Sequence, residues 1–203
     1  MKMTLYFLYR LLCIIGPCLI YLLIRARKTE ISIAKFHWLW ICLFLAYIFI
    51  VLEAVGIGSI WDIGNYDTVF RVDEINLIPF HSEGYRTYAL NVLLFIPLGL
   101  LLPIIGAKFR KLGNVIIVGA GFSFAIEVCQ LFNRRSTDID DLLMNTLGVL
   151  VGYCIWLAFS KLFNINKICH CEKISDYEAE TCLALAVLGD FFLFNWRFFI
   201  DNL

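Results

Sequence analysis

Apolar residues follow one another in long runs along this chain, and polar residues gather in the shorter stretches between those runs. A helix needs about 20 mostly apolar residues to cross the hydrocarbon core of a bilayer. The pattern therefore predicts an all-α polytopic bundle with about six membrane-spanning helices. The expected spans are Leu5–Ile24, Trp38–Ile60, Tyr88–Ala107, Leu112–Phe132, Leu142–Ser160 and Ala179–Ile200.

These runs differ in the charge that they carry. The second and fourth carry Glu53 and Glu127 towards one end, and the last carries Asp190 in its middle. Because a charge in hydrocarbon is costly, the last run is expected either to span the membrane or to lie along its interface. The first run lacks a small-residue cleavage site and continues into Arg25, so we expect a retained anchor and not a cleaved signal peptide.

The composition supports a membrane protein and narrows its partners. Hydrophobic residues make up 61% of the chain and charged residues 17%, whereas soluble domains usually carry about 25% charged residues. Membrane lipid is therefore the expected surrounding and partner, and the cell membrane the expected location. The formal net charge of +0 gives no reason to expect nucleic acid, and no cofactor is expected.

Most of the cysteines lie inside apolar runs, where a thiol behaves as a small apolar side chain. These are Cys13, Cys18, Cys42, Cys129, Cys154 and Cys182. One cluster, Cys169-His170-Cys171, lies between runs, but it falls short of a full zinc ligand set. We expect an ordinary loop there and no metal site.

Basic residues concentrate in alternate connections between the predicted spans. The first, third and fifth connections hold Arg25, Arg27, Lys28, Lys35, Lys108, Arg110, Lys111, Lys161, Lys167 and Lys173. The second and fourth hold only Arg71, Arg86, Arg134 and Arg135, and both are rich in aspartate. Because lysine and arginine favour the cytoplasmic side, the odd connections are expected inside and the even connections and both termini outside.

Polar side chains recur at helical spacing on both sides of the fourth connection. They form two stripes with the spacing i, i+3, i+7: Glu127, Gln130 and Arg134 before it, and Asp138, Asp141 and Asn145 after it. The connection is short, so the two helices should be antiparallel neighbours whose stripes can face each other. Carboxylates and amides facing lipid are costly, so this outward cluster should face the bundle interior or a wet cavity.

Structural explanations compete with a functional one at this cluster. Thr137 fits a helix N-cap, with three aspartates in the first turn to offset the helix dipole. Glu127 could form an ion pair with Arg134 or Arg135. The pair Gly148 and Gly152 forms a GxxxG motif, which usually packs helices closely. Capping alone explains neither Gln130 nor Asn145.

The second connection ends in the stretch EINLIPFHSEG, which is also expected outside. Pro79 excludes regular helix there, and Leu77, Ile78 and Phe80 make the piece apolar, so it should fold back to the interface or cover the cluster. His81 beside Glu83 is either a surface histidine or a group that titrates near neutral pH.

The third span contributes one polar residue near the same outer surface. This is Asn91, early in the run. Later in that run Pro97 and Pro103 should kink the helix and free backbone carbonyls, which neighbouring helices can satisfy.

Taken in order, NLIPF, NVLLFIPLGLLLP and EVCQLFNRRSTDIDDLLMNTLGVLVGY resemble the VanZ-like family of bacterial membrane proteins. The resemblance covers about Glu74 to Ser160. Its specific feature is the ordered combination of NLIPF, the N…P-G pattern, E-x-x-Q, R-x-x-D-x-x-D and D-x-x-x-N-x-x-G. It suggests three parts: two N-terminal helices at 1–60, a VanZ-like core at 61–160, and a loop with a last helix at 161–203.

The resemblance implies an envelope protein of bacterial, mostly Gram-positive, origin. The family's namesake is associated with reduced susceptibility to the glycopeptide teicoplanin. Matched to this sequence, the family's polar positions are Asn76, Pro79, Phe80, Asn91, Pro97, Glu127, Gln130, Arg134 or Arg135, Asp138, Asp141, Asn145 and Gly148.

Three functions stay open at this point. In the first, the cluster binds a lipid headgroup, a lipid-linked or cell-wall ligand or a glycopeptide. Arg134 and Arg135 would bind phosphate. The other expected ligand-binding residues are Asn76, Asn91, Gln130 and Asn145. In the second, the protein is a membrane-embedded enzyme whose candidate catalytic groups are Glu127 with Asp138 or Asp141. In the third, Glu53, Glu127 and Asp190 couple ion movement in a small transporter. The sequence leaves the oligomeric state open.

Overall fold

The structure is a computed structural model that describes residues 2–28, 35–63, 75–76, 78–79, 84–133, 137–163 and 177–199. Its α-helices are α1 (Lys2–Lys28), α2 (Lys35–Val55), α3 (Tyr85–Ile105), α4 (Leu112–Gln130), α5 (Ile139–Phe163) and α6 (Glu178–Leu193). Within the described residues there are also three 3₁₀ turns and two short strands: η1 (Ile60–Asp62), η3 (Ala107–Arg110), η5 (Trp196–Phe199), β1 (Ile75–Asn76) and β2 (Thr137–Asp138). The predicted helical membrane bundle is confirmed.

Helix length and surface chemistry agree on a membrane protein. Within the described residues, 5 helices are long and apolar enough to cross a bilayer: Met3–Lys28, His37–Asp62, Tyr85–Ile105, Leu112–Gln130 and Ile139–Leu162. The outer faces expose large apolar side chains such as Leu12 on α1, Leu90 on α3 and Phe124 on α4. Exposed apolar surface on this scale suits contact with acyl chains.

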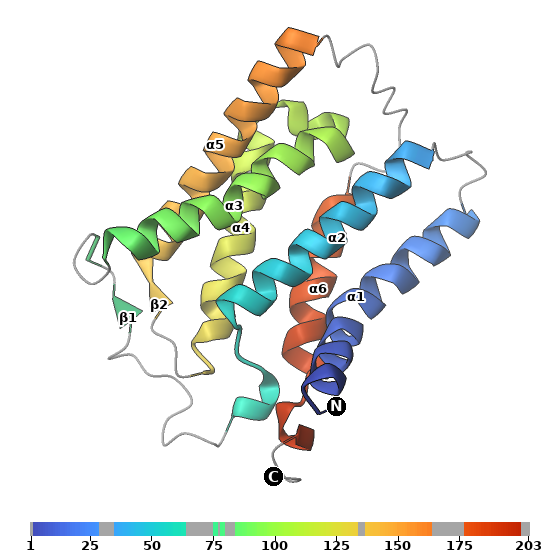
Figure 1. Ribbon diagram of the computed structural model, residues 1–203, viewed down its shortest axis with the longest axis vertical. Helices are drawn as coiled ribbons and strands as arrows, with labels where there is room; N and C mark the ends of the chain where they lie inside the picture. The colour runs from blue at the N-terminus through green and yellow to red at the C-terminus, as the bar shows by residue number, and fades with distance from the viewer. Residues whose placement is uncertain are drawn as a thin grey trace.

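Successive helices run in alternating directions, so connections fall at the two ends of the bundle in turn (Figure 1). Helices α2, α4 and α6 end toward the end of the bundle at which α1 begins. Helices α1, α3 and α5 end toward the opposite end. This arrangement matches the alternation on which the predicted sidedness depends; which end faces outward stays a prediction.

Helix α6 is shorter than the run predicted from the sequence, but it packs within the bundle. Cys182, Ala186 and Gly189 on one of its faces are buried, and α1 is its main neighbour. A Cβ at Gly189 would lie 2.2 Å from the carbonyl oxygen of Cys13, so the two backbones are in direct contact. The α-helix ends at Leu193, and η5 follows.

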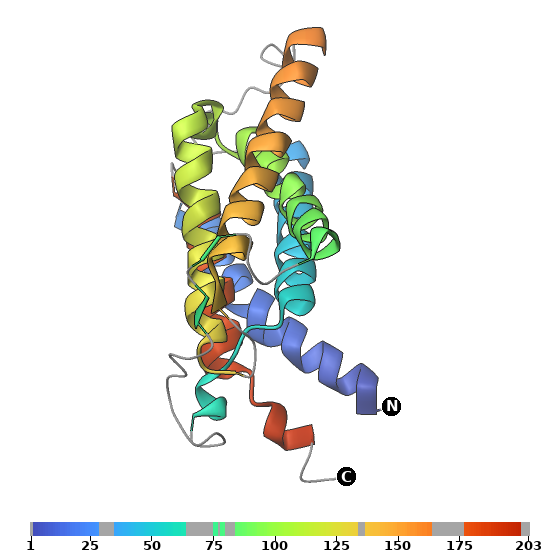
Figure 2. The ribbon, with the colours of Figure 1, turned by 90° about the vertical axis from the view of Figure 1, so that its left-hand side faces the viewer.

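Helices α3 and α5 make the closest contact in the bundle, and α5 lies between α4 and α3 in the view of Figure 2. A Cβ at Gly148 would lie 2.3 Å from the Val92 carbonyl oxygen, and one at Gly152 would lie 2.0 Å from that of Ile96. Gly99 on α3 makes the same kind of contact in the other direction, since a Cβ there would lie 2.0 Å from the carbonyl oxygen of Val149 on α5. The predicted packing role of the GxxxG motif is therefore confirmed, with α3 as its partner.

Helix α3 continues through both of its prolines, Pro97 and Pro103, as a single element. The hydroxyl of Tyr47 on α2 donates a hydrogen bond of 3.1 Å to the carbonyl oxygen of Leu94, in the turn before Pro97. Such a bond from a neighbouring helix stabilises a backbone that a proline has weakened. The predicted kink stays a prediction.

The charges within the first, second and last helices meet in one buried group. Arg10 on α1 donates to Asp190 on α6, from Nε to Oδ1 at 3.2 Å and from Nη2 to Oδ2 at 2.9 Å. Its Nη1 lies 2.7 Å from Oε2 of Glu53 on α2, and its guanidinium stacks 5.2 Å from the ring centre of Phe194. Arg10 is not among the charges predicted from the sequence to matter, although it gives Glu53 and Asp190 a structural reason to lie in the bundle.

The thiols of the described cysteines are all free, and Cys13, Cys18 and Cys182 are buried as expected of small apolar side chains. Cys42 and Cys154 are exposed on the outer faces of α2 and α5. The Cys169-His170-Cys171 cluster lies outside the described residues.

Candidate functional site

A cluster of carboxylates and amides lies where the C-terminal end of α4 meets the N-terminal ends of α3 and α5. Its buried members are Glu127, Gln130, Asp138, Asp140 and Asn145, and its half-buried members are Asn76, Tyr88, Asn91 and Asp141. The structure thus brings the described residues of the predicted site to one region of the bundle. Arg134 and Arg135, as well as Leu77, Phe80, His81 and Glu83, lie outside the described residues.

Asp138 holds the start of α5. The helix begins at Ile139, and Oδ1 of Asp138 accepts a 3.0 Å hydrogen bond from the backbone N–H of Asp140. A carboxylate oxygen that accepts from the second residue of a helix is a typical N-cap contact. The cap is therefore Asp138 and not Thr137 as predicted, because α5 begins at Ile139 and Asp138 is the residue directly before it.

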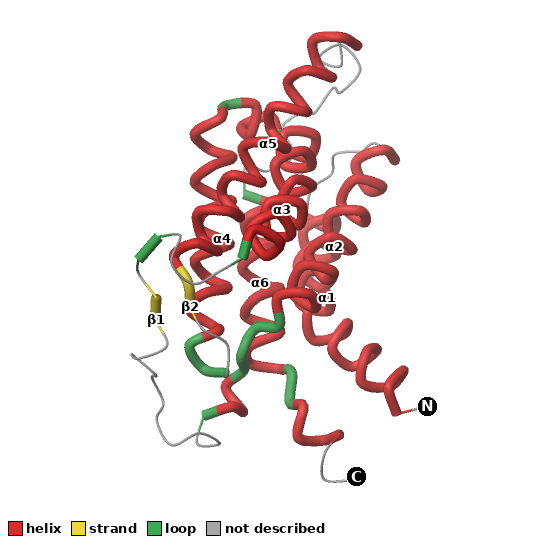
Figure 3. Tube along the Cα trace, turned by 60° about the vertical axis from the view of Figure 1, so that its left-hand side comes forward, coloured by secondary structure: helices red, strands yellow, loops and turns green. Residues whose placement is uncertain are grey.

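Asn76, from the NLIPF stretch, is tied to this cap. Strands β1 and β2 lie side by side next to the start of α5 (Figure 3), and Asn76 is the register partner of Asp138. Its side-chain Nδ2 donates to Asp138 Oδ2 at 3.2 Å, while its Oδ1 accepts from the backbone N–H of Ile78 at 3.1 Å. Asn76 thus contacts the polar cluster, whereas Ile78 and Pro79 are exposed, and the placement of the apolar stretch as a whole stays a prediction.

Glu127 joins α4 to the same point. Its Oε2 accepts a 3.2 Å hydrogen bond from the backbone N–H of Asp138, and only 5% of the residue is exposed. Its carboxylate is also close enough to Asp141 for the two charges to interact. An ion pair with Arg134 or Arg135 involves residues outside the described part of the chain.

The start of α3 supplies two polar groups to the start of α5. Nδ2 of Asn91 donates a short hydrogen bond to Oδ1 of Asp141, and the hydroxyl of Tyr88 donates to Oδ2 of Asp140 at 2.7 Å. Tyr88 is absent from the site predicted from the sequence, and the prediction for Asp140 is only that it offsets the helix dipole. A signal existed, because Tyr88 precedes Asn91 by three residues and so shares its helical face.

Asn145 marks the deep end of the cluster. Its Nδ2 donates to Oγ of Ser123 on α4 at 2.9 Å, and both residues are almost fully buried. Its Oδ1 is buried and has no hydrogen-bond partner among the residues that the structure describes. A buried amide oxygen without a partner is unfavourable, so this atom points to a water or ligand group that donates to it.

Gln130 presents a second acceptor of the same kind. Its Nε2 donates to the backbone carbonyl of Val55 at 3.2 Å, and its neighbour Asn133 donates to that of Gly56 at 2.9 Å. The Oε1 atom of Gln130 is buried without a hydrogen-bond partner in the described part of the chain. Gln130 and Asn133 therefore fix the end of α2 against α4, and the Oε1 atom of Gln130 is still available to accept a hydrogen bond from a ligand or water.

The described side chains of this cluster mostly offer acceptor atoms. Carboxylates come from Glu127, Asp138, Asp140 and Asp141, and amide oxygens come from Asn145 and Gln130. Such a set fits a ligand group that donates hydrogen bonds or carries positive charge, such as an amine or a sugar hydroxyl. Within the described residues, no three histidine, cysteine, aspartate or glutamate side chains are arranged so that they could hold a metal ion together.

Both carboxylate oxygens of Asp138 accept hydrogen bonds, one from the helix backbone and one from Asn76. This geometry suits a residue that positions α5 better than one that exchanges a proton with a substrate. The acid–base function considered from the sequence, with Glu127 and an aspartate as the reacting pair, remains a prediction.

The cap makes a measurable prediction. Asp138→Ala should lower the free energy of unfolding by about 1–2 kcal/mol, because it removes the N-cap and the bond to Asn76. Asp138→Asn should cost less, since asparagine caps helices about as well as aspartate. Denaturant unfolding of the purified protein in lipid nanodiscs measures both, and an equal loss for the two variants would contradict the capping role.

Comparison with known proteins extends these observations. The family model described as VanZ/LLP1 matches residues 38–162, more than half of the chain. Protein VanZ of Enterococcus faecium is 33% identical over 101 residues, which cover 46% of this chain and 59% of that protein. No solved structure matches the chain. The region that matches the family model contains the polar cluster and leaves out Arg10 and Asp190. Because this match covers more than half of the chain, the chain belongs to the VanZ/LLP1 family.

Proposed function

We propose that this protein acts in the bacterial cell membrane and lowers susceptibility to teicoplanin by binding a surface ligand through its polar cluster. The ligand is a lipid-linked or cell-wall component that donates hydrogen bonds from an amine or hydroxyl group. The similarity to Protein VanZ supports the glycopeptide connection. The acceptor-rich cluster supports the chemistry of the ligand.

One observation carries the proposal. Asn145 Oδ1 is buried at the deep end of the cluster without a hydrogen-bond partner among the described residues, while Asn91 and Asp141 above it are half-buried. A donor group that enters past Asn91 and Asp141 would satisfy an atom that is otherwise unfavourable to bury. The cluster thus combines an accessible edge with an unsatisfied interior, as a binding site for a small polar group requires.

The predicted sidedness places this cluster where such a ligand would be found. Connections after α1, α3 and α5 carry most of the lysine and arginine, which favours the cytoplasmic side for that end. The cluster lies where α4 ends and α3 and α5 begin, away from the end of the bundle at which η3 follows α3 (Figure 1). It would then open to the outer leaflet, where cell-wall precursors and glycopeptides meet.

The test uses a teicoplanin-susceptible host with and without the full chain. Expression is expected to raise the minimal inhibitory concentration of teicoplanin and to lower binding of labelled teicoplanin to cells. Asn91→Ala should remove this protection, because it breaks the contact to Asp141 at the accessible edge. Asn114→Ala is the matched control, since Asn114 is also half-buried but bonds to the Lys108 carbonyl at the opposite end, at 2.8 Å.

Membrane levels of both variants are compared by immunoblot. Protection that survives Asn91→Ala at equal protein levels would contradict the role of the cluster. Susceptibility that is the same with and without the wild-type chain would contradict the glycopeptide role itself.

A further inference from the structure

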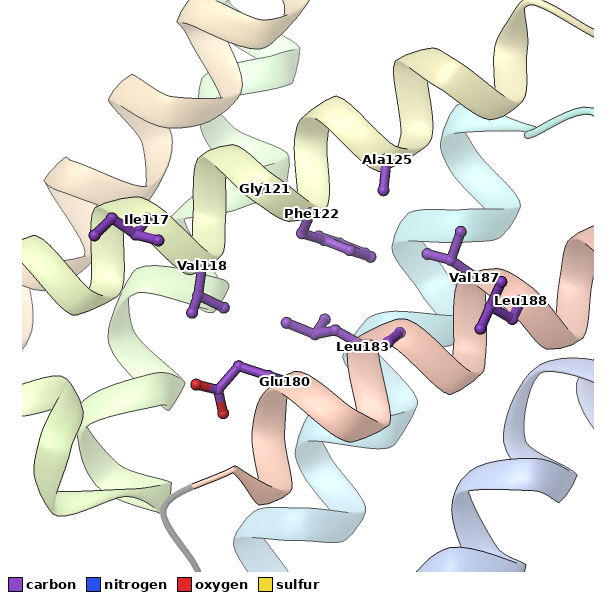
Figure 4. A pocket seen from close by; sticks show the side chains of 10 residues that line it. Ile117, Val118, Gly121, Phe122, Ala125, Glu180, Leu183, Val187 and Leu188 are labelled. Atoms are coloured by element: carbon purple, nitrogen blue, oxygen red, sulfur yellow. The ribbon is translucent and has the colours of Figure 1, made fainter.

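An apolar groove runs between α4 and α6, away from the polar cluster. Its volume is about 370 Å³. Figure 4 shows its two walls, with Ile117, Gly121 and Ala125 on α4 facing Leu183 and Leu188 on α6. Among the described residues of its lining, Glu180 alone is charged, and it lies at one end.

The groove exists because small residues leave space between two helices that are in limited contact. A Cβ at Gly121 would meet nothing within 4 Å, and Gly121 itself is exposed. Ala184 on the opposite wall is also exposed. In a bilayer such a space does not stay empty, because acyl chains or another helix fill it.

The Glu180 end of the groove is basic and aromatic. Lys108 forms an ion pair with Oε1 of Glu180, and its Nζ lies 4.2 Å from the ring centre of Tyr177 and 5.0 Å from that of Phe109. Arg110 and Lys111 follow Lys108 along the chain, so three cations occur within four residues. Basic and aromatic residues at the end of membrane helices suit the headgroup region of anionic lipids.

Glu180 restricts which kind of molecule can fill the groove. Its Oε2 is buried and has no hydrogen-bond partner in the described part of the chain, and its side chain extends away from α6 at this end of the groove (Figure 4). A transmembrane helix of a second copy seated there would have to bury this acceptor against apolar side chains. A lipid headgroup with hydroxyl groups can instead donate to it.

From these features we propose that the α4–α6 groove holds one acyl chain of an anionic, hydroxyl-bearing phospholipid such as phosphatidylglycerol. The phosphate lies by Lys108 and the neighbouring basic residues, the headgroup hydroxyls reach Glu180, and the acyl chain runs along Gly121 towards Ala125. The lipid belongs to the leaflet at the η3 end of the bundle. This site is separate from the polar cluster and does not depend on the proposed function.

Photoactivatable lipids test the site directly. The full chain is reconstituted in nanodiscs doped with diazirine-acyl phosphatidylglycerol or phosphatidylcholine, and cross-linked residues are mapped by mass spectrometry. We expect labelling at Ile117–Ala125 and Leu183–Leu188, about fivefold stronger with phosphatidylglycerol, because one basic contact to an anionic lipid contributes about 1 kcal/mol.

Two variants separate the acyl chain from the headgroup. Gly121→Phe should abolish groove labelling by filling the space, whereas Gly16→Phe on α1, also a glycine with nothing within 4 Å of its Cβ position, should preserve it. The double variant Lys108→Gln/Glu180→Gln removes both charges of one ion pair. It should keep acyl labelling and lose the preference for phosphatidylglycerol.

Three results would overturn the proposal. One is groove labelling that Gly121→Phe leaves unchanged. Another is equal labelling of the wild-type groove by the two lipids. The last is cross-linking of cysteines at Gly121 and Ala184 between two copies of the chain, which would make the groove a protein interface.

Discussion

Arg10→Met is expected to lower the free energy of unfolding by about 3–5 kcal/mol, because it leaves carboxylates in the bundle without their counter-ion. Arg10 lies between Asp190 and Glu53, and the side chains of Arg10 and Asp190 are only 7% and 1% exposed. Removing the cation forces Asp190 either to keep an unpaired buried charge or to take up a proton. Unfolding of the purified protein in lipid nanodiscs measures the loss.

A matched control on the same helix distinguishes the loss of a buried cation from the loss of an exposed one. Arg27→Met removes an exposed cation at the end of α1 and should change the free energy of unfolding by less than about 0.5 kcal/mol. The double variant Arg10→Met/Asp190→Leu should recover part of the loss, because it removes the buried carboxylate together with its cation. Equal stability of wild type and Arg10→Met would show that this group contributes nothing to the fold.

Gly152→Val is expected to have a comparable or larger effect, of at least about 4 kcal/mol, because the obstruction is backbone. A Cβ at Gly152 would lie 2.0 Å from the carbonyl oxygen of Ile96, and a backbone atom cannot rotate away as a side chain can. Helix α3 would have to move off α5, which would also loosen the contacts at Gly99 and Gly148. Since α3 and α5 position Asn91 and Asp141, teicoplanin protection should be lost as well.

The comparison for this variant is Gly16→Val on α1. A Cβ at Gly16 meets nothing within 4 Å, so the same substitution should cost about 1 kcal/mol or less there. Stability of Gly152→Val close to that of Gly16→Val would mean that the α3–α5 contact is looser than the structure shows.

The helices themselves could be predicted from the sequence because long apolar runs leave few alternatives. A run of about 20 apolar residues must satisfy its backbone hydrogen bonds internally, which makes it a helix wherever it lies in a bilayer. The GxxxG pair at Gly148 and Gly152 likewise indicated close packing. Its partner could not be predicted, because glycine spacing marks a face of α5 without saying which helix meets it. The structure identifies α3, whose Gly99 in turn packs against the backbone of α5 at Val149.

The buried ion pair shows a different limit of what could be predicted from the sequence. Glu53 and Asp190 were recognised as unusual charges in apolar runs, but Arg10 was not connected with them. The information was present, because helices that alternate in direction bring the start of α1 and the ends of α2 and α6 to the same end of the bundle (Figure 1). Opposite charges at matching depths in three membrane helices are better explained by pairing than by ion coupling.

Within the polar cluster, helical spacing predicted which residues share a face but not which atoms meet. Glu127 and Asp138 do face each other, yet the contact runs through the backbone N–H of Asp138, which no side-chain pattern encodes. The pairing of Asn76 with Asp138 joins residues 62 positions apart through a bridge of two residues. Sequence periodicity carries no signal for such a short strand.

The orientation of the bundle decides whether the polar cluster can meet a cell-surface ligand, and cysteine labelling in intact cells measures it most directly. In a background with the 8 native cysteines replaced by alanine, Tyr85→Cys places a thiol at a 92% exposed position at the cluster end. Lys111→Cys places one at an exposed position at the opposite end. A membrane-impermeant maleimide should label Tyr85→Cys in intact cells and Lys111→Cys only after permeabilisation. The reverse pattern would put the cluster on the cytoplasmic side and contradict an outward binding site.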